Sequence, residues 1–196
     1  MPVLYARVPE DRVGVVIGPG GRTKREIRSR TETQVDIDAE EGEVRITGPD
    51  TDPIRAMKAR DIVLAIGRGF SPERAMRLLK DNTYLGVLDI KFTTGKREKS
   101  ALRRIRARAI GKHGRARSRI EELSGCSMSV YGSTVALIGE EDQLERATRA
   151  VELLLKGSEH STVFHFLARL RRNAAVEELM GGSPSDSLPD VDLDVE

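Results

Sequence analysis

The chain has 196 residues, enough for one medium domain or two small ones, and 38% of them are hydrophobic, enough for small cores. It carries 33 Lys and Arg against 31 Asp and Glu, a formal net charge of only +2. A single cysteine, Cys126, excludes an intramolecular disulfide. No apolar run approaches the ~18 residues of a membrane span, so we expect a soluble, cytoplasmic protein without membrane contact.

The first 67 residues follow the order β-α-α-β-β-α. Period-two alternation and helical spacing of apolar residues predict strands over residues 3–8, 33–38 and 43–47 and helices over residues 10–17, 21–30 and 53–67. The first two helices are separated at Gly18-Pro19, because proline cannot continue a helix. The third begins near Pro53, at the first helical position, where proline is tolerated.

The same order recurs after a connector. Ser71 and Pro72 predict the cap and the first residue of a connecting helix that runs to about Lys80. The second copy has expected strands over residues 86–92, 127–131 and 134–138 and helices over residues 98–110, 115–123 and 140–156. We therefore expect domains over residues 1–68 and 85–158, a connector over 69–84, a C-terminal helix over 159–180 and a disordered acidic tail over 181–196.

A short glycine motif marks both copies. Ile17-Gly18-Pro19-Gly20-Gly21 is matched 93 residues later by Ile110-Gly111-Lys112-His113-Gly114, and each motif lies between the first two helices of its copy. In each copy a base follows three residues after the last glycine, and an isoleucine six residues after it. One such motif is common in tight turns between helices, but two in the same succession of elements indicate a duplicated unit.

Positive charge is concentrated in the second copy. Between Lys96 and Arg119 there are eleven Lys or Arg and one acid, a net charge of +10, against +4 between Arg7 and Arg30. Solvated helices usually interleave acids with bases, since unlike charges three or four residues apart stabilise them. The missing acids therefore indicate a polyanion partner. The tail over 181–196 has five acids and no base, so it docks on a basic partner, screens the basic helix or serves as a solubilising end.

A Gly-x-x-Gly corner between two helices suits a phosphate. Backbone N–H groups at the start of the second helix and the helix dipole favour an anion, and glycine lets a sugar-phosphate backbone approach closely. A narrow groove beside the corner would admit unpaired bases and exclude a duplex. We expect a single-stranded polynucleotide to be bound by the two loops and the bases near them: Gly18, Pro19, Gly20, Gly21, Arg22, Lys24, Arg25, Gly111, Lys112, His113, Gly114, Arg115, Arg117, Arg104 and Arg108.

The sequence carries no recognisable catalytic or cofactor motif. Neither a Walker loop nor a dinucleotide fingerprint occurs, so we expect no cofactor. The acids of residues 36–41 fit the solvent face of a strand and its turn better than a nuclease metal site, and no cysteine accompanies His160 or His165 in a zinc pattern. His113 is either an RNA contact or an exposed loop residue. We expect a non-catalytic binding protein, with an RNA-processing enzyme subunit or a single-stranded DNA-binding module as alternatives.

The pattern Ile-Gly-x-x-Gly between two helices, followed by a β-hairpin and a helix, resembles the KH domain of type I topology. This resemblance implies an α+β fold of two tandem KH domains, each with a three-stranded antiparallel sheet packed on helices. The connector Gly69-Phe70-Ser71-Pro72-Glu73-Arg74-Ala75 and the second motif, with Arg108-Ala109 before it, are similar more narrowly to the archaeal proteins with two KH domains. That group is related to the eukaryotic partner of the endonuclease that trims the small-subunit rRNA 3′ end. The resemblance covers about residues 3–172.

The narrower resemblance implies binding near the 3′ end of small-subunit rRNA during ribosome maturation. It also implies contact with the 3′-end endonuclease and with the alpha subunit of an initiation factor, and a role associated with translation initiation is the alternative. The chain departs from the KH pattern at Lys24 and Arg117, which replace an apolar residue and make the grooves more electrostatic. Since Pro19-Gly20 gives the first loop less charge than Lys112-His113 gives the second, we expect the second copy to dominate RNA affinity.

Overall fold

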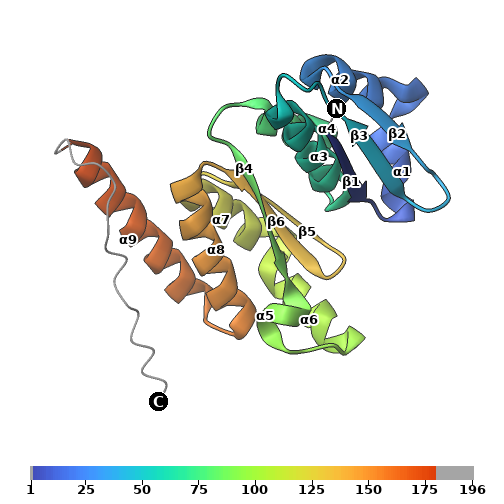
Figure 1. Cartoon of the computed structure of the whole chain (residues 1–196). Coiled ribbons are helices and arrows are strands. Elements are labelled where there is room, and N and C mark those ends of the chain that lie inside the picture. The colour runs from blue at the N-terminus through green and yellow to red at the C-terminus, as the bar shows by residue number, and fades with distance from the viewer. Residues whose placement is uncertain (1, 180–196) are drawn as a thin grey trace.

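The computed structural model describes residues 2–179, with side chains described for residues 2–176. Two three-stranded antiparallel sheets, each packed on helices, are joined by a short helical connector and followed by a long helix, α9 (Figure 1). This is the predicted α+β fold. The predicted acidic tail over residues 181–196 lies outside the described residues. Within residues 2–179, no helix has the length and apolar character that crossing a membrane requires.

The first copy has the predicted order of elements, with its strands arranged β1-β3-β2. Alternate residues explain the packing of the central strand, since Val44 and Ile46 are buried whereas Arg45 between them is exposed. The elements are β1 (Val3–Arg7), α1 (Glu10–Ile17), α2 (Arg22–Thr31), β2 (Gln34–Ile37), β3 (Glu43–Thr47) and α3 (Pro53–Gly67).

The connector is helical, as predicted, but it is not one continuous α-helix. The hydroxyl of Ser71 accepts a hydrogen bond from the N–H of Arg74 and begins α4 (Pro72–Ala75). A 3-10 turn over Met76–Leu79 then ends the connector. Phe70 and Leu78 are buried, so the connector is anchored to the protein rather than free in solvent.

The second copy repeats the order, with strands arranged β4-β6-β5 and one extra helix, α5. The predicted strand over residues 86–92 is wrong at its end, because the carboxylate of Asp89 accepts the N–H groups of Lys91 and Phe92 and starts α5 there. The elements are β4 (Tyr84–Asp89), α5 (Ile90–Thr94), α6 (Lys99–Ile110), α7 (Arg115–Ser124), β5 (Ser127–Tyr131), β6 (Thr134–Gly139) and α8 (Glu141–Lys156).

The last described element, α9 (His160–Leu179), packs on α7 and α8. Figure 1 shows it on the side of these two helices that faces away from the second sheet. Val163, Leu167 and Leu170 of α9 are buried in the core of the second copy. The second copy therefore has a further layer, formed by α9, outside α7 and α8.

Strand β6 is buried on both faces. Val135 and Leu137 belong to the core of the second copy, beneath its helices. Ala136 and Ile138 point the other way and belong to the core that contains α3 and the connector. Because successive side chains of a strand point to opposite faces, one strand supplies both cores.

Polar contacts at the edge of β5 reinforce this junction. The hydroxyl of Ser129 donates to the carbonyl of Arg68 at the end of α3, over 3.0 Å. Arg74 of the connector forms an ion pair with Glu121 of α7. The end of α3 is thus bonded to the edge strand, and the connector to a helix of the second copy.

Cys126 is buried, with only 3% of its surface exposed. Burial raises the pKa of its thiol to about 11. The thiol therefore stays protonated at neutral pH, which is unsuited to a nucleophile.

Replacing Ile138 by alanine should destabilise both copies together. The side chain is fully buried, so we expect a loss of about 2–5 kcal/mol in the free energy of unfolding. Urea denaturation followed by far-UV circular dichroism would measure it, with the exposed Val87→Thr as a control expected to change stability by less than about 0.5 kcal/mol. Unfolding of the second copy while the first remains folded would contradict the shared core.

Candidate nucleic-acid interface

The two Gly-x-x-Gly loops have nearly identical backbones. Gly18 has φ 73° and ψ 168°, and Gly111 has φ 74° and ψ 170°. The third residue of each loop is left-handed, with φ 55° at Gly20 and φ 54° at His113. The last glycine of each loop is left-handed as well. The sequence repeat is therefore also a repeat of backbone conformation.

The first glycine of each loop is required by both conformation and space. Its backbone lies in a region of φ and ψ that is essentially restricted to glycine. A Cβ at Gly111 would lie 2.6 Å from the Cβ of Ala116, and a Cβ at Gly18 would collide with Thr23. These contacts pack the start of each second helix against the end of the first. A Cβ at Gly114, by contrast, would meet open space.

The middle residues of both loops are exposed. Pro19 and Gly20 in the first loop, and Lys112 and His113 in the second, project from the surface. Of the flanking bases, Arg22, Arg25 and Arg115 are exposed, whereas Lys24 and Arg117 are half-buried. The glycine corners are thus accessible, and the predicted cations gather at the helix ends that follow them.

Arg117 lies on the side of α7 that faces the edge strand β5. Glu121, one turn later on the same side, accepts the N–H of Met128 of β5 over 2.6 Å and so fixes that orientation. The Nε of Arg117 is buried and has no hydrogen-bond partner among residues 2–176. A buried donor of this kind costs free energy unless an acceptor is supplied, and a phosphate or a base edge would supply one.

The two predicted contacts on α6 differ in their surroundings. Arg104 is exposed. The guanidinium of Arg108 donates to the carbonyls of Gly157 and Ser158, where α8 ends and α9 is about to begin. This contact closes the end of α8 against α6, so Arg108 already has a structural task, and its contact with RNA stays a prediction.

Three residues near the second loop were missing from the predicted site. Arg119 follows Arg115 by one helical turn and lies on the same side of α7. His160 and Phe164 come from the start of α9 and line a cavity with the loop. Helical spacing alone could have identified Arg119. No sequence signal places α9 beside the loop, because that depends on how α9 packs.

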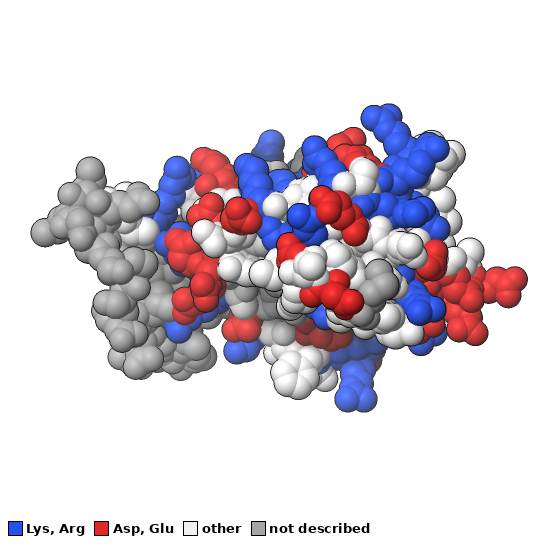
Figure 2. Space-filling view, turned by 45° about the horizontal axis from the view of Figure 1, so that its top comes forward, with Lys and Arg blue, Asp and Glu red and all other residues white. Residues whose placement is uncertain are grey.

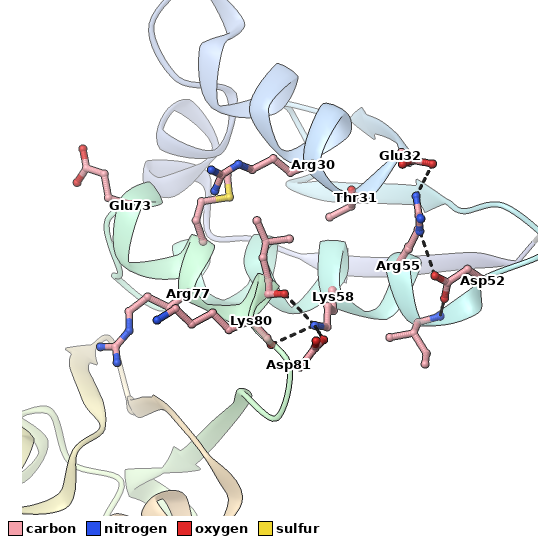
Figure 3. Close-up of a pocket in the computed structure, with 13 residues that line it drawn as sticks. Arg30, Thr31, Glu32, Asp52, Arg55, Lys58, Glu73, Arg77, Lys80 and Asp81 are labelled. Atoms are coloured by element: carbon pink, nitrogen blue, oxygen red, sulfur yellow. Dashed lines mark hydrogen bonds and ion pairs between the residues drawn. The ribbon is translucent and has the colours of Figure 1, made fainter.

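A large cavity of about 830 Å³ lies away from both loops, between the end of α2, the start of α3 and the connector (Figure 3). In Figure 3, Arg55 lies between Glu32 and Asp52, and the hydrogen bond from Arg55 lowers the pKa of Glu32 below its ordinary value. Lys58 donates to two connector carbonyls, over 2.9 and 3.0 Å. Arg55 thus joins the end of α2 to the start of α3, and Lys58 holds the connector against α3.

Charge is unevenly distributed over the surface. On the face shown in Figure 2, Lys and Arg side chains gather at the upper right, over the first copy, and a group of acids lies at the right-hand tip. Toward the middle of that face, acids are interspersed with bases. The first copy therefore also presents positive charge, despite its smaller net charge in sequence.

Comparison with known families agrees with this geometry. Residues 84–172 match the model described as "Eukaryotic type KH-domain (KH-domain type I)", and residues 4–61 match the model of the KH domain. A KH domain-containing protein of Methanocaldococcus jannaschii is 45% identical over 168 residues, which cover 85% of this chain and 73% of that protein.

Two solved structures are similar over nearly their whole length. Dim2p from Pyrococcus horikoshii has a TM-score of 0.81 and 50% identity, covering 86% of this chain and 99% of that one. A complex of a/eIF2alpha, aDim2p and rRNA from the same organism contains a chain with a TM-score of 0.82 and 49% identity, covering 88% of this chain and 95% of that one.

Alanine at the first and last glycine of the second loop should have different costs. Gly114→Ala adds only the strain of a left-handed residue, about 1–2 kcal/mol. Gly111→Ala adds the collision with Ala116 as well and should destabilise the protein by a larger amount. Urea denaturation of both variants measures the difference, and equal stabilities would show that the α6–α7 corner is not closely packed.

Proposed function

The chain belongs to the family of proteins with two KH domains that also contains Dim2p, and we propose that it acts as a non-catalytic RNA-binding factor in small-subunit maturation, near the rRNA 3′ end. In this proposal the Gly-x-x-Gly loops hold phosphates, and the grooves beside them take unpaired bases. The observation that carries it is the presence of two exposed loops with the same backbone conformation, each followed by a helix N-terminus and cations.

Helix geometry explains why a loop of this kind suits a phosphate. The helix that follows each loop begins with N–H groups that have no partner within the helix. These groups and the positive end of the helix dipole attract an anion. Since Gly21 and Gly114 have no side chain and face open space, a sugar-phosphate backbone can approach the last glycine of each loop closely. Phosphates thereby fix the position of the strand, and the groove reads its bases.

The second loop should contribute more affinity than the first. Pro19 has no N–H to donate, whereas Lys112 at the same position has an N–H and a positive charge. Arg117 adds a half-buried side chain on the side of α7 that faces β5, and its buried Nε has no hydrogen-bond partner among residues 2–176. Each further phosphate contact strengthens binding and steepens its dependence on salt.

We also propose two protein partners. The alpha subunit of an initiation factor is one, because the similar aDim2p chain was crystallised with a/eIF2alpha and rRNA. The endonuclease that trims the small-subunit rRNA 3′ end is the other, and it rests on the family resemblance. The endonuclease would supply the cleavage chemistry that RNA positioning alone does not, which fits a factor that holds RNA for other proteins.

Substitution of the middle residues of each loop tests the proposal. Lys112→Asp with His113→Asp should weaken binding to an oligonucleotide from the rRNA 3′ end by roughly tenfold or more, the loss expected for one charge-assisted hydrogen bond. Pro19→Asp with Gly20→Asp should weaken it less. Aspartate tolerates the left-handed backbone of His113 and Gly20, so both variants should fold. Fluorescence anisotropy over a salt series gives the dissociation constants.

The control is a variant with the same change in charge at a distance from the loops. Arg172→Asp with Asn173→Asp alters two exposed residues of α9, about 18 Å along the helix from His160. If this control weakens binding as much as the second-loop variant, the loops are not the site. Incubation with labelled RNA and Mg²⁺ addresses catalysis: we expect retention of intact RNA, and cleavage that depends on the protein would contradict a non-catalytic role.

A further inference from the structure

A cavity of about 480 Å³ lies between α7 and α9, at the end of α7 that carries the second loop. This volume is within the range of roughly 300–1,000 Å³ that is typical of small-molecule pockets. Glu121 has already fixed the opposite side of α7 as the one facing β5. The cavity therefore lies on the other side of α7 from β5, where the proposed function places the groove.

The cavity combines cations with aromatic rings. Lys112, Arg115 and Arg119 bring positive charge, and only Arg119 has an ion-pair partner among the described side chains, in Glu122 at 2.7 Å. Arg119 is nonetheless 47% exposed. The rings of His160 and Phe164 form an apolar wall, with their centroids 6.0 Å apart and their planes tilted by 47°. Phosphate and nucleobase are the two groups that such a lining recognises together.

The wall is held in a fixed position. The Nε2 of His160 is hydrogen-bonded to the carbonyl of Arg108, over 2.9 Å. The guanidinium of Arg108 in turn holds the segment before α9. Phe164 packs against the core of the second copy while keeping part of its ring accessible. The cavity is thus formed before any ligand arrives.

The first copy lacks the same chemistry at the matching positions. With the offset of 93 residues, Arg119 corresponds to Glu26, an acid that lies 3.9 Å from Arg30. The segment that follows α3 meets α2 at its far end, beside Arg30 and Thr31, rather than at the loop. Among the described residues, the pairing of a loop with an aromatic wall therefore belongs to the second copy.

We propose that this cavity is an additional nucleotide subsite, which receives the residue of the same RNA strand that flanks the phosphate held by the second loop. The base of that nucleotide stacks on Phe164, and its phosphate lies at Arg115 and Arg119. This inference rests on the proposed function. It implies that the strand passes over the loop, with one part in the groove at β5 and one flanking nucleotide on the α9 side.

Extension of a short oligonucleotide tests the subsite. Starting from the shortest rRNA 3′-end oligonucleotide that binds the Pro19→Asp, Gly20→Asp protein, nucleotides are added singly at each end. For the unaltered cavity, one or two nucleotides at one end should raise affinity about tenfold, within the range for one base–aromatic stack, and an abasic residue there should remove the gain. With Phe164→Leu in the same protein, the gain should fall below about twofold.

Two further variants keep the test decisive if Phe164→Leu is unstable. Arg119→Gln changes an exposed residue and should lower the slope of log affinity against log salt by about 0.7, the value for one phosphate contact of a single strand. Phe92→Leu is the matched aromatic control, since Phe92 is 93% exposed and lies outside the cavity, and it should leave the gain intact.

The outcomes separate the subsite from the loop. If the gain on extension persists in both Phe164→Leu and Arg119→Gln, the cavity is not a subsite, while the proposed function stands as long as the second-loop variant still weakens binding. If an abasic residue keeps the full gain, the site holds phosphate alone and base stacking is wrong. If no oligonucleotide binds in a way that depends on the second loop, both the subsite and the proposed function are overturned.

Discussion

The burial of β6 on both faces is the constraint on which the arrangement of the two copies depends. In an isolated second sheet, Ala136 and Ile138 would face water. Packed against α3 and the connector they are fully buried, and apolar area removed from water contributes about 25 cal/mol per Å². Two KH units that could have been linked flexibly therefore share apolar surface. Relative motion of the copies would expose that surface, so we expect them to move as one body.

The same junction extends to the candidate RNA site. Arg74 of the connector pairs with Glu121, and the Oε1 of Glu121 also accepts the N–H of Met128 on β5. One carboxylate thus joins the connector, α7 and the edge strand. With α7 held in this way, Arg117 is directed toward β5 and Arg115 toward α9. The contacts that unite the copies therefore also determine which cations lie on each side of the second loop.

The sequence predicted elements well wherever a local pattern decides them. Gly18-Pro19 ends α1 and Pro53 begins α3 because proline acts on its own backbone, and α1, β3, α3 and β5 have the predicted bounds. The predicted strand is wrong at residues 90–92, where apolar and charged residues go on alternating although the side chain of Asp89 caps a helix there. Capping by one aspartate is a local signal that the apolar pattern concealed.

Other features required tertiary information. The run from Val135 to Ile138 is apolar at every position, which is typical of a strand buried on both faces, whereas β3 alternates. The sequence therefore indicates that β6 is covered on both faces, but it does not identify α3 and the connector as the elements that cover the second face. The aromatic residues of α9 also required tertiary information. The sequence predicts the helix, but only tertiary packing places its Phe164 in the same cavity as Gly111.

The duplication explains why similar loops have different surroundings. Backbone geometry is the same in both copies, and in each the first glycine packs closely against the following helix, at Thr23 or Ala116. The residues beside the loops differ, with Pro19 against Lys112 and Glu26 against Arg119. The segment after the third helix also differs. In the first copy it is the connector, which must reach the second sheet and so meets α2 away from its loop. In the second copy no later sheet among the described residues constrains it, and α9 can begin beside the loop and add aromatic surface there. Tethering thus keeps the segment after α3 away from the first loop, whereas α9 reaches the second loop and lines a cavity beside it.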